Sequence, residues 1–491
     1  MNPIKLPKYQ LYLLQLENYE LGRYFRLLFK RGLWPKAAQR KELVWTAKAK
    51  ALMLMAIGLH ILIGVGLFFW AADSRPYMYA IAVVVWFFLF TTYYLLFTTA
   101  LLLLWPFDFI VKQFIIARAK YRVKGLDKLK VIGIAGSYGK TTMKQVLLEV
   151  LGAKFNVAAT PESVNTPVGI ARWVLKKFDG NLEIAIIEMG EHYQGDIKYL
   201  CDMLSPDIAV MTGINEAHLE RMKKMEIITD TIFEIVSNAK PGAEVVLNGD
   251  DKNITNNYKK YVWPDHRIER FKIEDLRFKS FDAEKLLWQA EIEGIGKIEI
   301  NLLGEYALGD VSAAVIIAKS LGMSGEEIKK GILNIQPVTH RLQPIRSAGN
   351  VLVIDDSYNG NPQGAAEAIR VLSRFENRRK VYTTPGLVEM GKAAPDIHRE
   401  IGKQLASVAD VVILIKNSVT PFIEEGILLV SSRPSEARAG IQEIDSRLRG
   451  NDKVAKIIWF GTAQEAHAAL STVLKGGDVV LFQNDWGDQY V

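Results

Sequence analysis

The sequence is nearly devoid of cysteine, since Cys201 is the single one in 491 residues. A lone thiol excludes an internal disulfide framework and a cysteine-based zinc cluster, and such cysteine usage is typical of a reducing compartment. Cys201 lies beside Leu200 and near Met203, so we interpret it as a residue of an apolar core.

Acidic residues are scarce at the N-terminal end. Residues 1–130 hold 6 Asp and Glu against 19 Lys and Arg, whereas the rest of the chain holds 48 against 42. The net charge of +7 therefore originates in the N-terminal segment alone. The concentration of positive charge in this segment favours anionic membrane lipid as a partner. The later domains lack the patch of basic residues interleaved with aromatic ones that is expected of nucleic-acid binding.

Two long runs of this basic segment lack charge. Residues 51–72 contain His60 as their only ionisable group, and a second apolar run covers residues 77–107. Each run is long enough to cross a bilayer core of about 30 Å, and both lie too far from the start for a cleaved signal peptide. They predict transmembrane helices at about 51–72 and 78–105 within a membrane-associated segment 1–125. A buried helical hairpin of a soluble protein is the alternative.

Charge on either side of these runs predicts their orientation. Residues 1–50 hold 11 Lys and Arg and residues 112–130 hold 7, but the turn between the runs holds only Arg75. The positive-inside rule places both flanks, and everything after them, on the cytoplasmic side of the cytoplasmic membrane. Residues 11–33 alternate apolar and basic positions, which predicts an interfacial amphipathic helix or, alternatively, a solvated one.

The common phosphate-loop spacing GxxxxGK[ST] is absent, because position 134 is Ile. A short apolar strand at 131–135 nevertheless leads into a glycine-containing loop, followed by a predicted helix at 143–151. Glycines let backbone N–H groups face phosphates, and the helix N-terminus adds positive potential. Lys140 is expected to reach the outer phosphates of ATP and Thr141 to ligate Mg²⁺. The predicted nucleotide-binding residues are Gly136, Ser137, Tyr138, Gly139, Lys140, Thr141 and Thr142.

The run GIAGSYGKTT, with glycines at 133, 136 and 139, resembles the loop of the Mur ligase family. Further matches follow in the family's order, around Asn165, at the strand end Ile186–Gly190 and in the run from Asn215 to Glu220. The resemblance implies that Glu188 and His218 act beside Mg²⁺ together with the catalytic Lys140, and that Asn165 contacts substrate. Taken alone, a Glu at a strand end or a single His is usually structural.

The segment IDDSYNGNP, residues 354–362, resembles a signature of the branch of this family that adds D-alanyl-D-alanine. By this resemblance Asp356 would bind the ATP ribose, and Asn359 and Asn361 would bind substrate. The alternative is that these residues form a helix-capping turn without a role in binding. The resemblance also assigns two further residues to ATP, Arg341 at the domain hinge and Asp310 on the adenine side.

Alternation of strands and helices predicts a parallel α/β architecture for both later domains. The predicted C-terminal strands lie at 380–384, 411–415, 427–430, 456–460 and 478–482. The predicted fold class is thus α/β, with an N-terminal transmembrane helical hairpin (1–125), a central phosphate-loop ATPase-like domain (126–338) and a C-terminal Rossmann-like domain (339–491). Residues 431–453 fit no period and are interpreted as a surface insert.

The resemblance implies an ATP- and Mg²⁺-dependent ligase of peptidoglycan precursor synthesis. It would join a muramyl-peptide carboxylate to D-Ala-D-Ala through an acyl phosphate, at the cytoplasmic face of the membrane. Two alternatives stay open: an amide ligase of the same fold for another acid, and a weakly catalytic ATP-binding scaffold at the membrane.

The sequence departs from the family pattern in four places. No domain for a UDP-sugar precedes the phosphate loop, and the apolar hairpin stands there instead. The position expected for a carbamylated lysine is Ile232, with Glu234 two residues later, which puts a second Mg²⁺ in doubt. Asp310 replaces an asparagine, and the tail at 483–488 differs from the family's usual ending.

Overall fold

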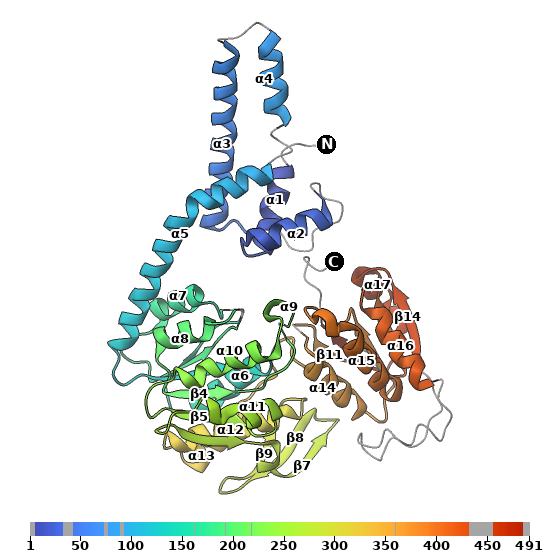
Figure 1. Ribbon diagram of the computed structural model, residues 1–491. Coiled ribbons are helices and arrows are strands. Elements are labelled where there is room, and N and C mark those ends of the chain that lie inside the picture. Colours follow the sequence, from blue (N-terminus) through green and yellow to red (C-terminus); the bar gives the residue numbers. More distant parts are fainter. Residues whose placement is uncertain are drawn as a thin grey trace. The chain divides into compact units, whose positions relative to one another are not determined.

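The computed structural model describes residues 5–32, 43–72, 77–88, 93–162, 164–191, 193–217, 219–358, 360–431 and 455–484. The chain forms two compact units, one reaching to Phe114 and one running from Ile115 to Asp485. Figure 1 shows their elements: the first is helical, and the second contains all the strands that the structure describes.

The N-terminal unit is built from five helices: α1 Lys5–Leu16, α2 Leu21–Arg31, α3 Ala47–Ala72, α4 Tyr77–Phe88 and the part of α5 (Tyr93–Lys124) that precedes Ile115. A core cluster joins α1, α2, the beginning of α3 and the beginning of α5. Leu11 and Leu14 of α1, Leu52 of α3 and Phe97 of α5 are fully buried there. This base of the unit therefore has a protein interior of its own.

Helix α3 is accompanied along its length by a returning leg made of α4 and the first half of α5. Three contacts show that the two legs run in opposite directions, because the residue numbers fall along α3 as they rise along α4 and α5. They are Phe68 to Tyr79 (ring centroids 5.6 Å apart), His60 to Tyr93 (5.4 Å), and Lys48 Nζ to Asp108 Oδ2 (2.9 Å). The arrangement is an antiparallel helical hairpin. With 26 residues at 1.5 Å each, α3 is about 39 Å long, which exceeds the thickness of a bilayer core.

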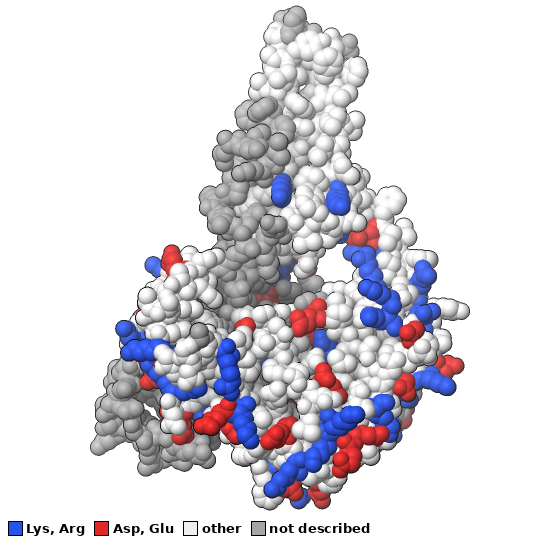
Figure 2. Space-filling view, turned by 180° about the vertical axis from the view of Figure 1, so that it is seen from behind, with Lys and Arg blue, Asp and Glu red and all other residues white. Residues whose placement is uncertain are grey.

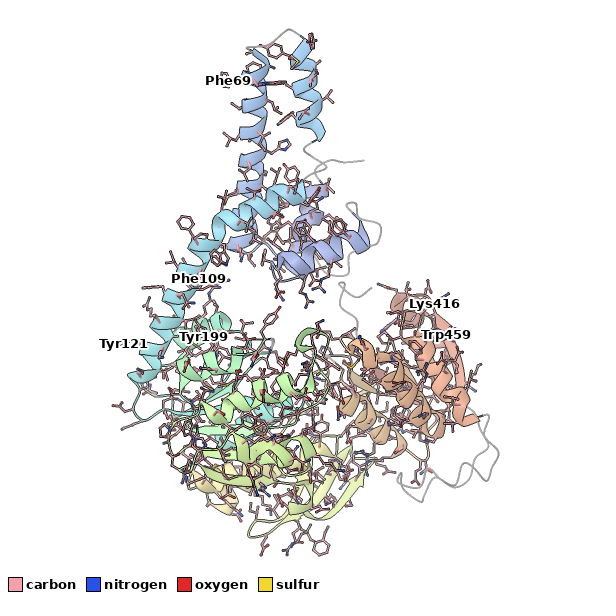
Figure 3. All side chains as sticks on the ribbon, in the orientation of Figure 1. Phe69, Phe109, Tyr121, Tyr199, Lys416 and Trp459 are labelled. Carbon is pink, nitrogen blue, oxygen red and sulfur yellow. The ribbon has the colours of Figure 1, made fainter. Side chains whose placement is uncertain are left out.

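The far end of this hairpin exposes apolar side chains. On the face seen in Figure 2, the described residues in the upper part of the N-terminal unit include no Lys, Arg, Asp or Glu. Phe69, near the far end of α3, is 68% exposed, whereas Phe109 of α5, next to Asp108 near the base, is 51% exposed (Figure 3). Two of the described helices, Ala47–Ala72 and Tyr93–Lys124, are long and apolar enough to cross a membrane by length and composition.

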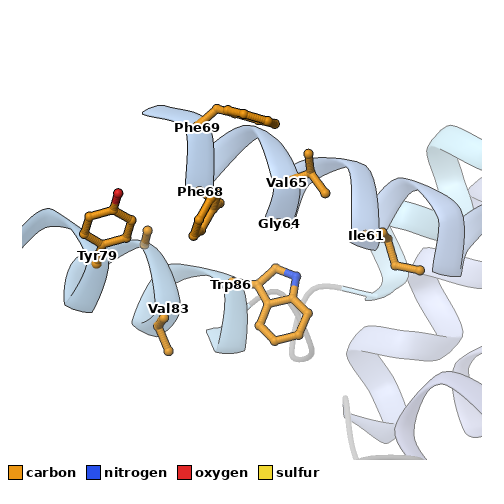
Figure 4. Close-up of a pocket in the computed structure, with 9 residues that line it drawn as sticks. Ile61, Gly64, Val65, Phe68, Phe69, Tyr79, Val83 and Trp86 are labelled. Carbon is orange, nitrogen blue, oxygen red and sulfur yellow. The ribbon is translucent and has the colours of Figure 1, made fainter. Parts of the chain in front are cut away.

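Helices α3 and α4 enclose an apolar groove of about 480 Å³. Trp86 points from α4 toward Gly64 of α3 in Figure 4, and a Cβ atom on Gly64 would lie only 2.4 Å from Trp86 Nε1. The Trp86 indole also donates to the backbone oxygen of His60 at 3.3 Å. Glycine at position 64 thus permits the close approach of the two helices.

The helix bounds of this unit differ from those predicted. For the second apolar run, predicted as a helix at about 78–105, the structure describes α4, Tyr77–Phe88, and α5 from Tyr93 onward, while residues 89–92 lie outside the described residues. The single interfacial helix predicted over 11–33 is wrong. Asn18 and Tyr19 have φ of 52° and 64°, which divides the segment into α1 and α2. The apolar face of α2 is covered by the unit's own core rather than left for lipid.

The second unit begins with a six-stranded parallel sheet in the order β2-β3-β1-β4-β5-β6. The strands are β1 Lys130–Ala135, β2 Val157–Ala159, β3 Ile184–Glu188, β4 Ile208–Met211, β5 Glu244–Asn248 and β6 Arg267–Phe271. Side chains alternate between the two faces of a strand. Ile132 and Ile134 of β1 therefore pack on one side of the sheet, and Val131 and Ala135 on the other.

Helices cover both faces of this sheet (Figure 1). On one face lie α6 Lys140–Gly152, α12 Tyr306–Ser320 and α13 Gly325–Leu333. On the other lie α7 Pro167–Lys177, α8 Asp196–Leu204, α10 Met225–Ser237 and the end of α5. The short helices α9 Leu219–Met222 and α11 Lys252–Asn257 complete the domain. An antiparallel sheet of β7 Arg277–Asp282, β8 Leu287–Ile292 and β9 Gly296–Ile300 precedes α12.

The C-terminal domain has a second six-stranded sheet in the order β10-β11-β15-β12-β13-β14. Its strands are β10 Gln343–Arg346, β11 Leu352–Asp356, β12 Lys380–Thr384, β13 Val411–Ile415, β14 Lys456–Phe460 and β15 Val479–Gln483. All neighbours are parallel except the edge strand β10. The accompanying helices are α14 Pro362–Ser373, α15 Ala394–Val408, α16 Thr420–Ser431 and α17 Ala463–Val473. The α/β fold class is thus confirmed for both domains.

One predicted C-terminal strand is wrong, because the apolar run 427–430 lies within helix α16. Short apolar runs do not distinguish a strand from a buried helix. Here Ile423 and Ile427, four residues apart, are buried, while Leu428 and Leu429 are about half exposed, as on one helix face. Except for Ser431, the predicted insert 431–453 lies outside the described residues.

Candidate active site

The loop between β1 and α6 has the geometry of a phosphate cradle. Gly136 and Gly139 have φ of 151° and 79°, and a Cβ atom on Gly136 would lie 2.2 Å from Thr212 Oγ1. Both positions therefore require glycine. The Ser137 N–H donates to the backbone oxygen of Gly213 at 2.8 Å, which ties the loop to the end of β4. Helix α6 begins directly at Lys140, so its N-terminus faces this loop.

Four charged side chains and one hydroxyl meet beside the loop. Lys140 Nζ donates to Glu191 Oε1 at 2.7 Å, and Lys144 Nζ donates to Glu188 Oε2 at 2.9 Å. The Thr141 hydroxyl lies 3.2 and 3.3 Å from the two carboxylate oxygens of Glu188. The structure thus brings together three predicted residues, Lys140, Thr141 and Glu188.

Sequence reasoning missed Lys144 and Glu191, which are 5% and 2% exposed. A signal existed for Lys144, because residues four apart lie on the same face of a helix. The signal for Glu191 was weaker: it follows the strand-end Glu188 by three residues. Their partners, Lys140 and Glu188, have side chains that are 13% and 14% exposed, so both ion pairs are largely shielded from solvent.

The donor set suits Mg²⁺ better than a softer metal. Within the described residues no three His, Cys, Asp or Glu side chains gather into a ready-made metal site. Mg²⁺ commonly takes one or two carboxylates, with water and substrate phosphates completing its shell. Glu188 and the Thr141 hydroxyl fit that requirement. The predicted metal-side residue His218 lies outside the described residues.

The position expected for a carbamylated lysine offers no ligand. Ile232 is fully buried in the apolar core beside α10. Glu234 accepts hydrogen bonds from the backbone N–H groups of Gly195 (2.8 Å) and Lys198 (2.9 Å), so its carboxylate caps the beginning of α8. Both side chains therefore have structural roles.

Tyr138 closes the other side of the loop. Its hydroxyl donates to Asp251 Oδ2 at 2.9 Å, and the same oxygen accepts the N–H of Ile214 at 2.9 Å. A Cβ atom on Gly213 would meet the Tyr138 ring. Burial, followed by the nearby Asp251 charge, raises the pKa of Tyr138, so the phenol stays protonated. The loop conformation is thus fixed from three neighbouring segments.

A buried acidic group lies at the start of α12. Asp310 is 5% exposed, and its Oδ2 has no hydrogen-bond partner among the described residues. Burial raises the pKa of Asp310 well above its usual value. A protonated carboxyl can donate a hydrogen bond, as the family's asparagine amide can. Asp310 therefore suits the predicted adenine-side position.

The segment after β11 links the two domains. The Asn361 side chain caps α14 by accepting the Gly364 N–H at 3.0 Å, and it also accepts from Asn215 Nδ2 at 3.1 Å. Asn215 donates to Gln363 as well, so the substrate-side loop of the central domain is tied to the C-terminal domain. Asn359 lies outside the described residues.

The remaining predicted residues occupy three places in this unit. The guanidinium of Arg341 lies 4.6 Å from the ring centre of Tyr358. The Asp356 carboxylate accepts a hydrogen bond from the N–H of Leu342 at 3.2 Å, and Leu342 directly follows Arg341 in the chain. Asn165 accepts the Gly190 N–H through its backbone oxygen at 3.2 Å, two residues from Glu188.

Burial raises the pKa of Asp356 to about 7, and the Arg341 charge opposes that shift. Between about pH 4 and 7 the folded protein keeps a proton that the unfolded chain has released, so the free energy of unfolding falls as the pH rises through this window. We expect Asp356→Asn to raise that free energy by about 1–2 kcal/mol at pH 8, allowing for partial exposure, and to change it little at pH 4.

Thermal unfolding of the wild type and of Asp356→Asn at pH 4 and pH 8 measures this difference. Asp410→Asn, at a strand start of the same sheet, is the control. Equal melting shifts at both pH values would contradict the assignment of a raised pKa to Asp356.

Two protein-family models match the chain, one over the central domain and one over the C-terminal domain. The model of the Mur ligase middle domain matches residues 134–318, and that of the Mur ligase glutamate ligase domain matches residues 340–483. The chain belongs to the Mur ligase family. Together the two matches cover about two thirds of the chain, and they begin at the phosphate loop and at the hinge before Arg341.

Relatives of this Mur ligase include curated and solved proteins. It is 28% identical over 305 residues to the UDP-N-acetylmuramoyl-tripeptide--D-alanyl-D-alanine ligase of Bacillus subtilis; the match covers 61% of this chain and 65% of that protein. The crystal structure of MurF ligase from Thermotoga maritima in complex with ADP is 26% identical, with a TM-score of 0.63 over 76% of this chain and 80% of that one. MurF from Acinetobacter baumannii has the same fold, with 24% identity and a TM-score of 0.64 over 76% and 77% of the two chains. The chain thus spans less than two thirds of the Bacillus subtilis relative's length.

Proposed function

We propose that this Mur ligase uses ATP and Mg²⁺ to join a muramyl-peptide carboxylate to D-Ala-D-Ala. The observation that carries the proposal is the cluster of Lys140, Thr141 and Glu188 at the phosphate loop, in a chain whose segment from Asp356 to Asn361 is tied to the central domain through Asn215. The names of the curated relatives and the ADP complex of the Thermotoga maritima enzyme support it.

The residues divide the work by chemistry. The glycine loop and the N-terminus of α6 would hold the phosphates, and the Lys140 ammonium would stabilise charge on the transferring phosphoryl group. Bound Mg²⁺, held by Thr141 and Glu188, would supply further positive charge. Asp356 and Asp310 would orient the nucleoside. The peptide carboxylate would take the terminal phosphoryl group of ATP, and ADP would leave. The dipeptide amine would then attack the acyl carbon and lose a proton, and phosphate would leave with the electrons of the C–O bond.

Release of phosphate tests the reaction directly. Detergent-solubilised full-length protein should release phosphate from ATP only when both the muramyl peptide and D-Ala-D-Ala are present. Turnover that is equal with L-Ala-L-Ala, or absent with all combinations, would count against the proposal.

A different acid substrate is the second candidate. The first 133 residues match neither family model, and the match to the Bacillus subtilis relative covers 65% of that protein. Recognition of the acid's remote part could therefore differ. Mass spectrometry of products from a panel of acids separates this candidate from the first.

A catalytically weak scaffold is the third candidate. It predicts an unchanged cell wall when Lys140 is replaced.

The N-terminal hairpin is proposed to tether the ligase in the cytoplasmic membrane, with the catalytic unit in the cytoplasm. The antiparallel packing of α3 with α4 and α5, the exposed apolar residues at its far end and the cationic flanks support this placement. Membrane lipid would then be a partner of the exposed groove between α3 and α4.

Cysteine labelling provides a test of this topology. The only native thiol, Cys201, is 1% exposed, and burial raises its pKa, so it does not react readily. In spheroplasts we expect a membrane-impermeant maleimide to label Ser74→Cys from outside, but to label Lys128→Cys only after permeabilisation. If Ser74→Cys also required permeabilisation, the hairpin would not cross the membrane.

A further inference from the structure

The phosphate loop has a second buried carboxylate to which the family resemblance assigns no role. Glu191 lies three residues after the end of β3 and is 2% exposed. Its Oε1 accepts from Lys140 Nζ at 2.7 Å, which directs the carboxylate at the loop. Its Oε2 is buried and has no hydrogen-bond partner within the described residues. One oxygen of this group is therefore left without a ligand.

Two lysines of α6 neutralise the two carboxylates at the end of β3. Lys140 pairs with Glu191, and Lys144, one helical turn later, pairs with Glu188. Lysines four residues apart project from the same helix face. The described residues of the site thus include two positive and two negative side chains, which form two ion pairs.

Nucleotide binding disturbs this pairing. A phosphate-loop lysine works by contacting the outer phosphates, so Lys140 has to leave Glu191. Glu191 would then be a buried carboxylate without a counter-charge, beside additional negative phosphates, which is strongly unfavourable. A divalent cation entering with the nucleotide removes that penalty, since Mg²⁺ takes one or two carboxylates together with phosphate oxygens.

Neither the α10 position 232 nor Glu234 provides this ligand. Ile232 is buried among apolar side chains, and Glu234 is occupied by the N–H groups of Gly195 and Lys198. Glu188 already faces the Thr141 hydroxyl and Lys144. Glu191 therefore retains an oxygen, Oε2, without a hydrogen-bond partner among the described residues; Asp310 Oδ2, on α12, is the other buried carboxylate oxygen without one.

We propose that Glu191 is the second carboxylate ligand of the divalent cation that accompanies the nucleotide, exchanging Lys140 for that cation on binding. The inference rests on the proposed use of ATP. In this chain the second carboxylate would thus follow β3, whereas the family's ligand position on α10 is occupied by Ile232.

Equilibrium binding without turnover tests the exchange. Calorimetry measures the affinity of full-length protein in detergent for adenylyl imidodiphosphate, with and without Mg²⁺, and electron paramagnetic resonance measures Mn²⁺ binding to the nucleotide complex. In Glu191→Gln we expect metal-free nucleotide affinity to be unchanged or severalfold higher, because Lys140 is released. We expect the enhancement by Mg²⁺, and the affinity for Mn²⁺, to fall about tenfold or more.

Glu149→Gln is the matched control. Glu149 lies on α6, the helix that begins at Lys140, and its carboxylate accepts a hydrogen bond from Gln145 at 2.8 Å. It should leave both quantities unchanged. A Glu191→Gln protein that keeps the wild-type Mg²⁺ enhancement would overturn the proposal and leave Glu191 as a partner of Lys140 only. Wild-type protein that binds no nucleotide would overturn the proposed function instead.

Glu191→Asp provides a second measurement if the glutamine variant does not fold. Aspartate keeps the charge but shortens the side chain, so Mn²⁺ affinity should fall severalfold while the melting temperature stays near that of the wild type. Unchanged Mn²⁺ affinity in this variant would also overturn the proposal.

Discussion

Replacing Lys140 by alanine will lower ATP turnover about a thousandfold, the largest effect expected of any single side chain in the site. A positioned cation or donor that stabilises charge on a transferring group contributes about 10²–10⁵ in rate. Lys140 begins α6, and its Nζ already lies at the loop, 2.7 Å from Glu191. Steady-state phosphate release with saturating substrates measures the loss.

Loss of the ammonium also leaves the buried Glu191 carboxylate without its partner, which can destabilise the fold. The double variant Lys140→Ala/Glu191→Gln removes both charges and separates the two effects. It should melt near the wild-type temperature and still lack turnover. Lys154→Ala is the control, because Lys154 forms an ion pair of similar length, 3.2 Å, with Glu327 at the surface. Turnover of Lys140→Ala within tenfold of the wild type would remove Lys140 from the mechanism.

Replacing Gly402 by alanine should destabilise the C-terminal domain by about 3 kcal/mol or more. Helices α15 and α16 contact each other through glycines, and a Cβ atom on Gly402 would lie 2.1 Å from the backbone oxygen of Ile423 and 2.9 Å from Gly426 Cα. Backbone atoms cannot move aside as a flexible side chain can, so the helices would have to separate.

Urea unfolding followed by tryptophan fluorescence measures this change, since Trp459 of β14 donates to Glu424 of α16 at 3.1 Å and reports on the helix pair. Gly152→Ala is the matched control. Gly152 also lies in a helix, but a Cβ atom there would meet no other atom within 4 Å, so this variant should gain about 0.5–1 kcal/mol. A Gly402→Ala protein as stable as the wild type would refute the close contact.

The sequence was most informative where one segment carries its own geometry. The strand, loop and helix around Lys140 were predictable because glycine spacing and a short apolar strand are local features, and the structure places them as expected. The loop positions need no knowledge of distant parts of the chain. Glu188 was assigned through the family resemblance, because a Glu at a strand end is by itself usually structural.

Partnerships between segments were not predictable. Nothing in the letters around Glu191 indicates that its carboxylate meets Lys140, 51 residues earlier in the chain. The apolar run at 427–430 was assigned to a strand because periodicity does not separate a short strand from part of a helix.

The strand order of the C-terminal sheet has a consequence for biosynthesis. Its last strand, β15, lies between β11 and β12 rather than at an edge. The sheet therefore has a gap until residues 479–483 have left the ribosome, although the central domain can already fold during synthesis. Asp356 at the end of β11 acquires its parallel partner Gln483 only when β15 has been synthesised. A nascent chain thus completes its phosphate loop early, but it cannot assemble both halves of the proposed nucleotide site before residues 479–483 have emerged.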